Sequence, residues 1–465
     1  MRRCTLVLVF VGVWSWFAGL AAGCSQPGGG LRILDDLEHH GLISDGGVDG
    51  EPRPTASIAD DGVPADGPIT LPILFDAADR LNPQMAAARA RIGEAGGLAW
   101  QASLRPNPSV ELESENVRPS GGGLGRSETT LSVRQPIVLG DRLGAATRAG
   151  EARVDAERWA FEETRREIHG RIRRLATEIE FDRVAITLYE ELRTLSERTL
   201  DVADTRFEAR AAPESESIRA RVELNTLVLA IERLRGELAA SATRLETLLG
   251  GHPVDARRVT VGAGRSEVRE VPSLEDLAGL VRSDHPAVRA AAAAVEVAER
   301  NVELERARAR PDLETRFGIG IDHADDEGFI EAGVGLPLPV YDRNQGNVLA
   351  ARFGVIRAQR EAAAVSSELL GQLGEAYRRL ESATTRLGIL ETEVLVDAQR
   401  SYEQASVGYE AGKLPFLDLL DAQRTLAEAT IAQSELCRSV SLAQADIEVI
   451  LGRRLGPPIE SEELP

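Results

Sequence analysis

The stretch that decides the fold is GYEAGKLPFLDLLDAQ, residues Gly408–Gln423, which has a counterpart about 200 residues earlier, TRFEARAAPESESIRA, Thr205–Ala220. In each stretch a polar run without helix breakers ends, a proline follows, and a second helical run begins. Both stretches therefore predict a bend at which one helix stops and another starts. The C-terminal copy carries two aspartates just after the bend, Asp418 and Asp421.

The two bends belong to an internal repeat. Four landmarks of the first half recur 201 to 203 residues later: Asn82-Pro83 as His285-Pro286, Gln135-Pro136-Ile137 as Leu336-Pro337-Leu338, Phe207 and Pro213 as Tyr409 and Pro415, and the LLG ending at Gly250 as the ILG ending at Gly452. A nearly constant displacement predicts the same order of elements in both halves. We expect a first repeat over residues 69–252, a linker over 253–272, a second repeat over 273–452 and a tail over 453–465.

Each repeat contains two segments in which apolar and polar residues alternate: 109–117 and 128–137 in the first half, 311–321 and 328–338 in the second. Alternation with period two predicts strands of about 9–11 residues, most simply paired as hairpins. A half-buried sheet of a soluble protein alternates in the same way. The length of the strands, and the lack of a second sheet to cover them, favour the strands of a membrane barrel. Four strands cannot close a barrel alone, so several chains would share it.

The rest of each repeat is expected to be helical. Long helices are predicted over 141–212 and 342–411, which contain no proline and few glycines, and returning helices over 214–249 and 416–451. A helix of seventy residues is roughly 105 Å long and needs neighbours along its length. The Ala-rich stretch from Ser273 to Arg310 is predicted to be one further helix, which Pro311 ends and which Ser273 and Asp276 cap at its start.

The N-terminus has the pattern of an export signal. Arg2 and Arg3 precede an apolar run, and LAAGC then ends at Cys24. This predicts a signal peptide over residues 1–23, with Cys24 as a lipid-attachment site of the bacterial lipoprotein type. Ordinary cleavage nearby is the alternative. Ser25 follows Cys24, which in such lipoproteins implies delivery to the outer membrane. Residues 24–68, rich in Gly, Pro, Asp and Ser, are expected to be a flexible, lipid-anchored linker.

Composition excludes several classes of function. The net charge of −20 argues against binding nucleic acid, because a phosphate backbone requires a basic surface. The six histidines are scattered, and none stands with cysteines or carboxylates at a metal-ligand spacing. No catalytic group of residues and no phosphate-binding loop stands out. We therefore expect no enzyme, no cofactor and no resident metal.

At this point the chain resembles the TolC-like outer-membrane efflux family over about residues 70–455. Tyr409, Gly412, Asp418 and the LLDAQ of Leu419–Gln423 resemble the family's tip motif. LPLPVYDRNQG, 336–346, and RPNP, 105–108, are similar to the heavy-metal branch that serves cobalt–zinc–cadmium pumps. The resemblance implies an α+β membrane protein: a homotrimer whose chains share an antiparallel β-barrel, four strands each, in the outer membrane of a Gram-negative-type bacterium. It also implies a long periplasmic α-helical barrel that narrows at the bends.

The bends then become the candidate periplasmic gate, formed by Asp418, Asp421 and Tyr409. Gly412, Pro415, Pro213 and Glu216 would shape the tip turns. Asp418 and Asp421 are three residues apart, so they share one helix face and could form an acidic ring that attracts cations. The alternative is that they only complement the dipole of their helix. Where the family's best-known member has an arginine, this chain has Leu414, so a salt-bridge lock is in doubt, while Tyr409 could bond to the neighbouring hairpin.

The function implied is a passive exit duct of a tripartite efflux system. Its expected partners are a periplasmic adaptor protein, an inner-membrane pump driven by protons, and outer-membrane lipid. Heavy-metal cations are one possible substrate, and drugs, dyes or secreted polypeptides are others. The main alternative is a periplasmic coiled-coil lipoprotein, a scaffold or adaptor without a pore. Such a protein would carry one helical hairpin rather than two in register with two strand pairs.

Overall fold

The computed structural model describes residues 66–117, 127–261, 271–452 and 455. The described part is mostly helical and divides into two compact units. The first unit holds a four-stranded sheet and the adjoining ends of helices α4 (Pro83–Ser103), α5 (Arg142–Glu208), α8 (Pro286–Arg308) and α9 (Gln345–Ile389). The second holds the remaining helices. Cys24, the predicted signal peptide and nearly all of the predicted N-terminal linker lie outside the described residues.

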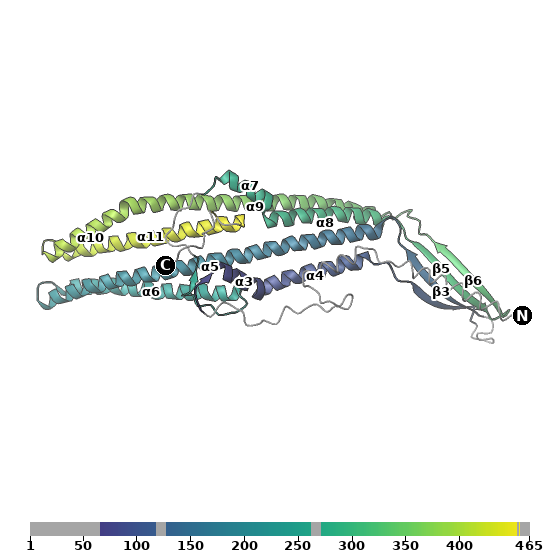
Figure 1. Cartoon of the computed structure of the whole chain (residues 1–465), viewed down its shortest axis with the longest axis horizontal. Helices are drawn as coiled ribbons and strands as arrows, with labels where there is room; N and C mark the ends of the chain where they lie inside the picture. The colour runs from purple at the N-terminus through teal and green to yellow at the C-terminus, as the bar shows by residue number, and fades with distance from the viewer. Residues whose placement is uncertain (1–65, 118–126, 262–270, 453–454, 456–465) are drawn as a thin grey trace. The chain divides into compact units, whose positions relative to one another are not determined.

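The sheet is antiparallel, with strand order β2-β3-β5-β6. Its strands are β2 (Ser109–Glu115), β3 (Glu128–Ile137), β5 (Leu313–Asp322) and β6 (Glu327–Gly335). The register aligns Leu112, Leu131, Ile319 and Ile330 in one apolar row across all four strands. Leu112 is 73% exposed, Leu131 46% and Ile330 58%, so the described part of the chain leaves this face open. The strands are drawn as the arrows β3, β5 and β6 and the unlabelled β2 in Figure 1.

The opposite face of the sheet is polar. The Arg134 guanidinium pairs with Glu111 at 3.0 Å, and Arg316 pairs with Glu113 at 2.9 Å. The strands lie where the alternation predicts them, except that β2 has seven residues rather than about nine. Asn116 has a left-handed φ of 59°, which ends the extended run before Val117.

The second unit contains two antiparallel helical hairpins. In the first, α5 returns as α6 (Glu214–Leu248), and in the second, α10 (Leu395–Glu410) returns as α11 (Phe416–Leu451). Within each hairpin the two helices lie side by side (Figure 1). The packing surfaces are rich in alanine and leucine, as the low aromatic content of 4% leads one to expect.

Two of the predicted helices are interrupted. The helix expected from Ser273 to Arg310 is two helices, α7 (Leu274–Asp284) and α8, because Pro286 forces His285 into an extended conformation with ψ 126°. The rod expected over 342–411 contains a π-helical turn, η2 (Leu390–Val394), between α9 and α10. The cap expected for α7 is present: the Ser273 side chain accepts from the Asp276 N–H.

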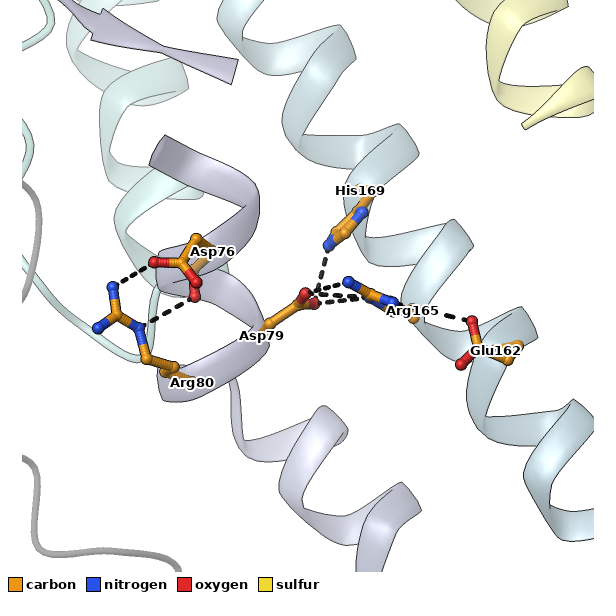
Figure 2. Close-up of polar contacts among 6 residues, drawn as sticks. All are labelled: Asp76, Asp79, Arg80, Glu162, Arg165 and His169. Atoms are coloured by element: carbon orange, nitrogen blue, oxygen red, sulfur yellow. Dashed lines mark hydrogen bonds and ion pairs between the residues drawn. The ribbon is translucent and has the colours of Figure 1, made fainter. Parts of the chain in front are cut away.

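The short helix α3 (Leu71–Leu81) is anchored on α5 by a charged cluster, which Figure 2 shows. The Asp79 carboxylate accepts from Arg165 Nη2 at 2.7 Å and pairs with His169 Nε2 at 2.8 Å. Phe75 stacks on the His169 ring with centroids 4.3 Å apart. Burial tends to raise the pKa of Asp79, but the hydrogen bonds from His169 and Arg165 outweigh it and lower the pKa overall.

A second contact of this region lay outside the sequence prediction. The stretch interpreted as an inter-repeat linker contributes β4 (Val259–Thr260), which pairs in parallel with β1 (Ile69–Thr70). Val259 is fully buried against Leu74, Ile172 and Leu249 in one apolar cluster. Two residues of alternation are too few to be recognised as a strand. No helix in the described part of the chain is both long and apolar enough to cross a membrane.

Candidate functional site

The tip of the second hairpin ends α10 with a glycine in the left-handed conformation. Gly412 has φ 68°; its N–H donates to the Tyr409 carbonyl at 3.0 Å, and the Lys413 N–H donates to the Gly408 carbonyl at 2.8 Å. This pair of bonds is the Schellman arrangement. The Leu414 side chain folds back over Gly408, where a Cβ would come within 2.5 Å of its Cδ1 atom. Leu414 therefore takes part in the turn itself.

The tip of the first hairpin makes the same turn without a glycine. Arg210 occupies the left-handed position with φ 55°, and its N–H donates to the Phe207 carbonyl at 2.9 Å. The Ala211 N–H donates to the Arg206 carbonyl at 2.8 Å. A residue with a Cβ pays a conformational penalty there, because its Cβ approaches the following carbonyl.

Both prolines stand where a helix begins. Pro213 precedes α6 and Pro415 precedes α11, with φ of −75° and −73° and extended ψ. The ring fixes φ near these values, so each proline directs the chain out of the turn and into the returning helix. Three residues on, the Glu216 N–H donates to the Pro213 carbonyl and the Asp418 N–H to the Pro415 carbonyl, each at 3.1 Å.

Tyr409 joins the two hairpins within one chain. Its side chain is 2% exposed, and its hydroxyl donates to Glu216 Oε2 at 3.3 Å. The Arg206 guanidinium carbon lies 4.5 Å from the centre of its ring, and the Phe416 ring packs on it at 5.6 Å. Burial raises the pKa of Tyr409, partly offset by Arg206, and the nearby Glu216 carboxylate raises it further. The hydroxyl therefore stays a donor.

A second link between the hairpins was not predicted. Gln423 on α11 is 4% exposed; its Oε1 accepts from Thr199 Oγ1 at 2.9 Å, and its Nε2 donates to Ser196 Oγ at 3.0 Å. At the surface, Arg424 pairs with Glu223 at 2.8 Å. The signal in the sequence is a polar residue on the same helix face as Leu419 and Leu420, a place where an apolar residue is expected.

The predicted acid pair does not join these contacts. Asp418 and Asp421 are both exposed, on the first turns of α11. In the first hairpin the positions aligned with Asp418 and Asp421 are Glu216 and Arg219. Glu216 turns toward Tyr409, whereas Arg219 is exposed. The structure thus brings together Tyr409 and Glu216 among the predicted site residues and leaves the two aspartates facing outward from the chain.

No metal centre accompanies the tips. Among the residues that the structure describes, no group of three or more His, Cys, Asp or Glu side chains is placed to hold a metal ion. Cys437, the described cysteine, lies half-buried on α11 and packs at the edge of an apolar cluster.

Paired hairpins with this tip, together with the sheet, define an efflux channel of the outer-membrane class. The chain belongs to the outer membrane efflux protein family, whose pattern matches residues 74–251 and 277–453, one match in each repeat. This agrees with the resemblance seen in the sequence, and proteins of this family are channels and not enzymes.

The relatives include heavy-metal resistance proteins. The chain is 27% identical to the cobalt-zinc-cadmium resistance protein CzcC of Cupriavidus metallidurans, over 84% of this chain and 91% of that protein. It is 26% identical to the nickel-cobalt-cadmium resistance protein NccC of Alcaligenes xylosoxydans, over 77% and 80%.

Solved structures share the fold. CusC superposes with a TM-score of 0.70 at 16% identity, over 82% of this chain and 92% of that chain. The outer membrane protein VceC of Vibrio cholerae superposes with a TM-score of 0.67 at 18% identity, over 83% and 96%.

Proposed function

We propose that this protein is the exit duct of a tripartite efflux system, a homotrimer in the outer membrane of a Gram-negative bacterium. An inner-membrane pump driven by protons supplies the energy, and a periplasmic adaptor joins that pump to the hairpin tips. The duct itself conducts passively. Family membership supports the class of function, and Cys24, if acylated, would add a lipid anchor.

The observation that carries the proposal is the uncovered sheet. One of its faces is a series of exposed apolar side chains, among them Leu112 and Val334, each 73% exposed. The sheet order leaves β2 and β6 at its edges. Lipid tolerates such a face but not unpaired backbone at an edge, so the edges require strands from other chains. Four strands from each of three chains would close a barrel of twelve strands.

The hairpin tips supply the gate in this proposal. The exposed pair Asp418 and Asp421 would be repeated three times around one opening, and carboxylates in a ring favour cations over anions. Tyr409, bonded to Glu216, would hold the second hairpin against the first in the closed state. Opening then requires this contact to break.

The proposed substrates are heavy-metal cations. The relatives CzcC and NccC are named for resistance to cobalt, cadmium, and zinc or nickel. A cation path agrees with the acid pair at the tip and with the net charge of −20. The described residues hold no metal cluster, so in this proposal the ion is cargo that passes through and not a resident cofactor.

The test is single-channel conductance in planar bilayers. The parent is compared with Asp418→Ala plus Asp421→Ala, and with a control that removes two exposed charges from α7, Glu275→Ala plus Asp284→Ala. We expect small, cation-selective openings in the parent. In the tip variant conductance should rise about twofold, because the shorter alanine side chains widen the opening, and selectivity should fall, because the ring field that favours cations is lost. The control should match the parent.

The outcomes separate the parts of the proposal. Current that is unchanged in the tip variant would support the duct, but it would indicate that the two aspartates only complement the dipole of their helix. Folded, membrane-inserted protein without any current would reject the duct in favour of a periplasmic scaffold without a pore.

A further inference from the structure

The π-helical turn η2 distinguishes the second hairpin from the first. The Leu395 N–H donates to the Leu390 carbonyl five residues back, where a regular α-helix has four. The Thr392 hydroxyl donates to the Gly388 carbonyl at 2.8 Å, a bond that competes with the helix's own ladder. In the first hairpin, α5 runs from Arg142 to Glu208 as one α-helix.

The turn coincides with a shift of the buried positions along the helix. Before it, buried residues alternate in steps of three and four: Leu373, Ala376, Leu380, Ala383, Leu387 and Leu390. Continuing this pattern by seven residues leads to Val394 and Asp397, but Val394 is 45% exposed and Asp397 is exposed as well. The buried positions resume instead at Ala398 and Ala405. The helix therefore contains one residue more than its packing pattern needs.

In the first repeat the corresponding helix has no such irregularity. It runs over 67 residues, Arg142–Glu208, whereas α9, η2 and α10 together run over Gln345–Glu410, one residue fewer. In α5 the buried residues Ser196 and Ala203 continue the series from Asp182 in multiples of seven, with no shift. The shift at η2 therefore belongs to the packing of the second hairpin alone, and a π-turn is the form in which a helix accommodates one residue beyond its packing pattern.

The turn also lies between two separate apolar clusters. One cluster holds the α9 residues up to Leu390 with Leu436 and the α11 residues beyond it. The other lies at the tips and includes Ala405, Tyr409, Phe416 and Ala422. Residues 391–394 are all exposed, and a hydrogen bond of 2.9 Å from Gln433 Nε2 to Glu391 Oε1 crosses the hairpin there. Bending at this level leaves the first of these clusters intact, whereas the tip cluster also contains Ala203 of α5 and Ala220 of α6 and opens when the hairpins part.

We propose that Leu390–Val394 is the hinge of the gate: the part of the second hairpin beyond it, α10 with the facing half of α11, swings as a unit away from the first hairpin. This inference rests on the proposed function. Several contacts between the hairpins must open. They include those from Tyr409 to Glu216 and Arg206, from Gln423 to Thr199 and Ser196, and from Arg424 to Glu223. The first hairpin, with its uninterrupted α5, is the fixed side.

The first test does not depend on transport. Hydrogen–deuterium exchange of the whole protein in detergent compares residues 389–397 with the aligned stretch of α5, 187–195. We expect the amides at η2 to exchange about tenfold faster, because local opening is easiest where the ladder is irregular. Deleting Thr392 restores an unshifted pattern and should slow exchange to the level of α5. Equal rates at the two stretches in the parent would overturn the hinge.

The second test measures the gate. Deleting Thr392 in the Asp418→Ala, Asp421→Ala background should reduce the frequency of large openings about tenfold, because the straight helix holds the tip closed. Glu393→Ala is the matched control, since it keeps the length of the helix at η2 and the Thr392 hydrogen bond, and should open as its parent does. Openings unchanged by the deletion would overturn the hinge and keep the duct. If the parent shows no current, the duct fails, while the exchange experiment still decides whether η2 opens.

Discussion

The two repeats share one order of elements, yet they fix the same positions with different side chains. The residue that caps the helix beginning at Pro83 in the first repeat is Asn82. The residue in the same place before Pro286 in the second repeat is His285. At the tips, the first has Arg210 and the second Gly412 in the left-handed position. Both α3 and α7 dock through apolar contacts, and the first repeat adds the Asp79 ion cluster. Duplication thus preserved the backbone while each copy acquired its own chemistry.

The junction caps give the largest expected difference between the repeats. Asn82 Oδ1 accepts from the Gln84 N–H at 2.7 Å, and His285 Nδ1 accepts from the Ala287 N–H at 3.0 Å. The imidazole can accept only while it is neutral. Burial, and secondarily the Arg166 guanidinium, lower the pKa of His285 from 6.5 to about 4, and Glu163 on the same helix α5 stands 3.9 Å from Nδ1.

The first prediction follows from that lowered pKa. As pH falls below 6.5 the unfolded chain takes up the proton first, so stability declines until the folded state is protonated near pH 4. The loss over this window is about 3 kcal/mol, and it should be absent in His285→Asn, which copies the cap of the first repeat. Urea unfolding in detergent at pH 7, 5.5 and 4 measures it. Parallel pH profiles of parent and variant would contradict the role of the imidazole.

The second prediction concerns the docking of α3. Asp79→Ala removes the acceptor shared by Arg165 and His169 (Figure 2) and should lower the stability by about 2 kcal/mol, because hydrogen bonds to a charged group are lost. The matched control is Arg282→Ala, the aligned position of α7, which is exposed and should change stability by less than about 0.5 kcal/mol. Thermal melting followed by circular dichroism compares them. Equal effects of the two changes would show that α3 and α7 dock alike.

The smallest expected effect is at the tips. Gly412→Ala places a Cβ in the left-handed position and should lower stability by about 1 kcal/mol. Arg210→Gly relieves the same penalty in the first hairpin and should raise stability by a few tenths of a kcal/mol. The gain is small because glycine also increases the entropy of the unfolded chain, which offsets part of the relief. The two changes should therefore shift the melting temperature in opposite directions. A shift of the same sign would mean that the two turns are not equivalent.

The elements of the fold could be predicted from the sequence wherever one local signal dominates. Alternation placed the strands, and the absence of proline placed the long helices. Pro286 restricts His285 to an extended conformation and so divides the Ala-rich run. The strong helical propensity of the residues around it nevertheless predicts a single helix. The π-helical turn could not be predicted, because its signal is a one-residue shift in the positions that are buried along the helix, which composition does not reveal.

The candidate site was only partly predictable. The turn residues could be identified because Gly412 and the prolines act through their own backbone geometry. The contact from Tyr409 to Glu216 joins residues 193 apart, and the Gln423 link joins residues more than 200 apart. Which polar side chains form these contacts depends on how the two hairpins pack. A single sequence does not show which residues far apart in the chain lie close together in space.

The edges of the sheet have a consequence for how the molecule matures. With β2 and β6 unpaired at the two sides, a single chain presents open hydrogen-bonding groups next to exposed apolar side chains. Such an edge pairs with whatever strand it meets first, including those of unrelated chains. In the proposed trimer, correct completion of the sheet needs other copies of this chain, so its rate would rise with the local concentration of the protein, in competition with aggregation. The level of expression and chaperoning would then determine the yield of that assembly as much as the stability of any helix.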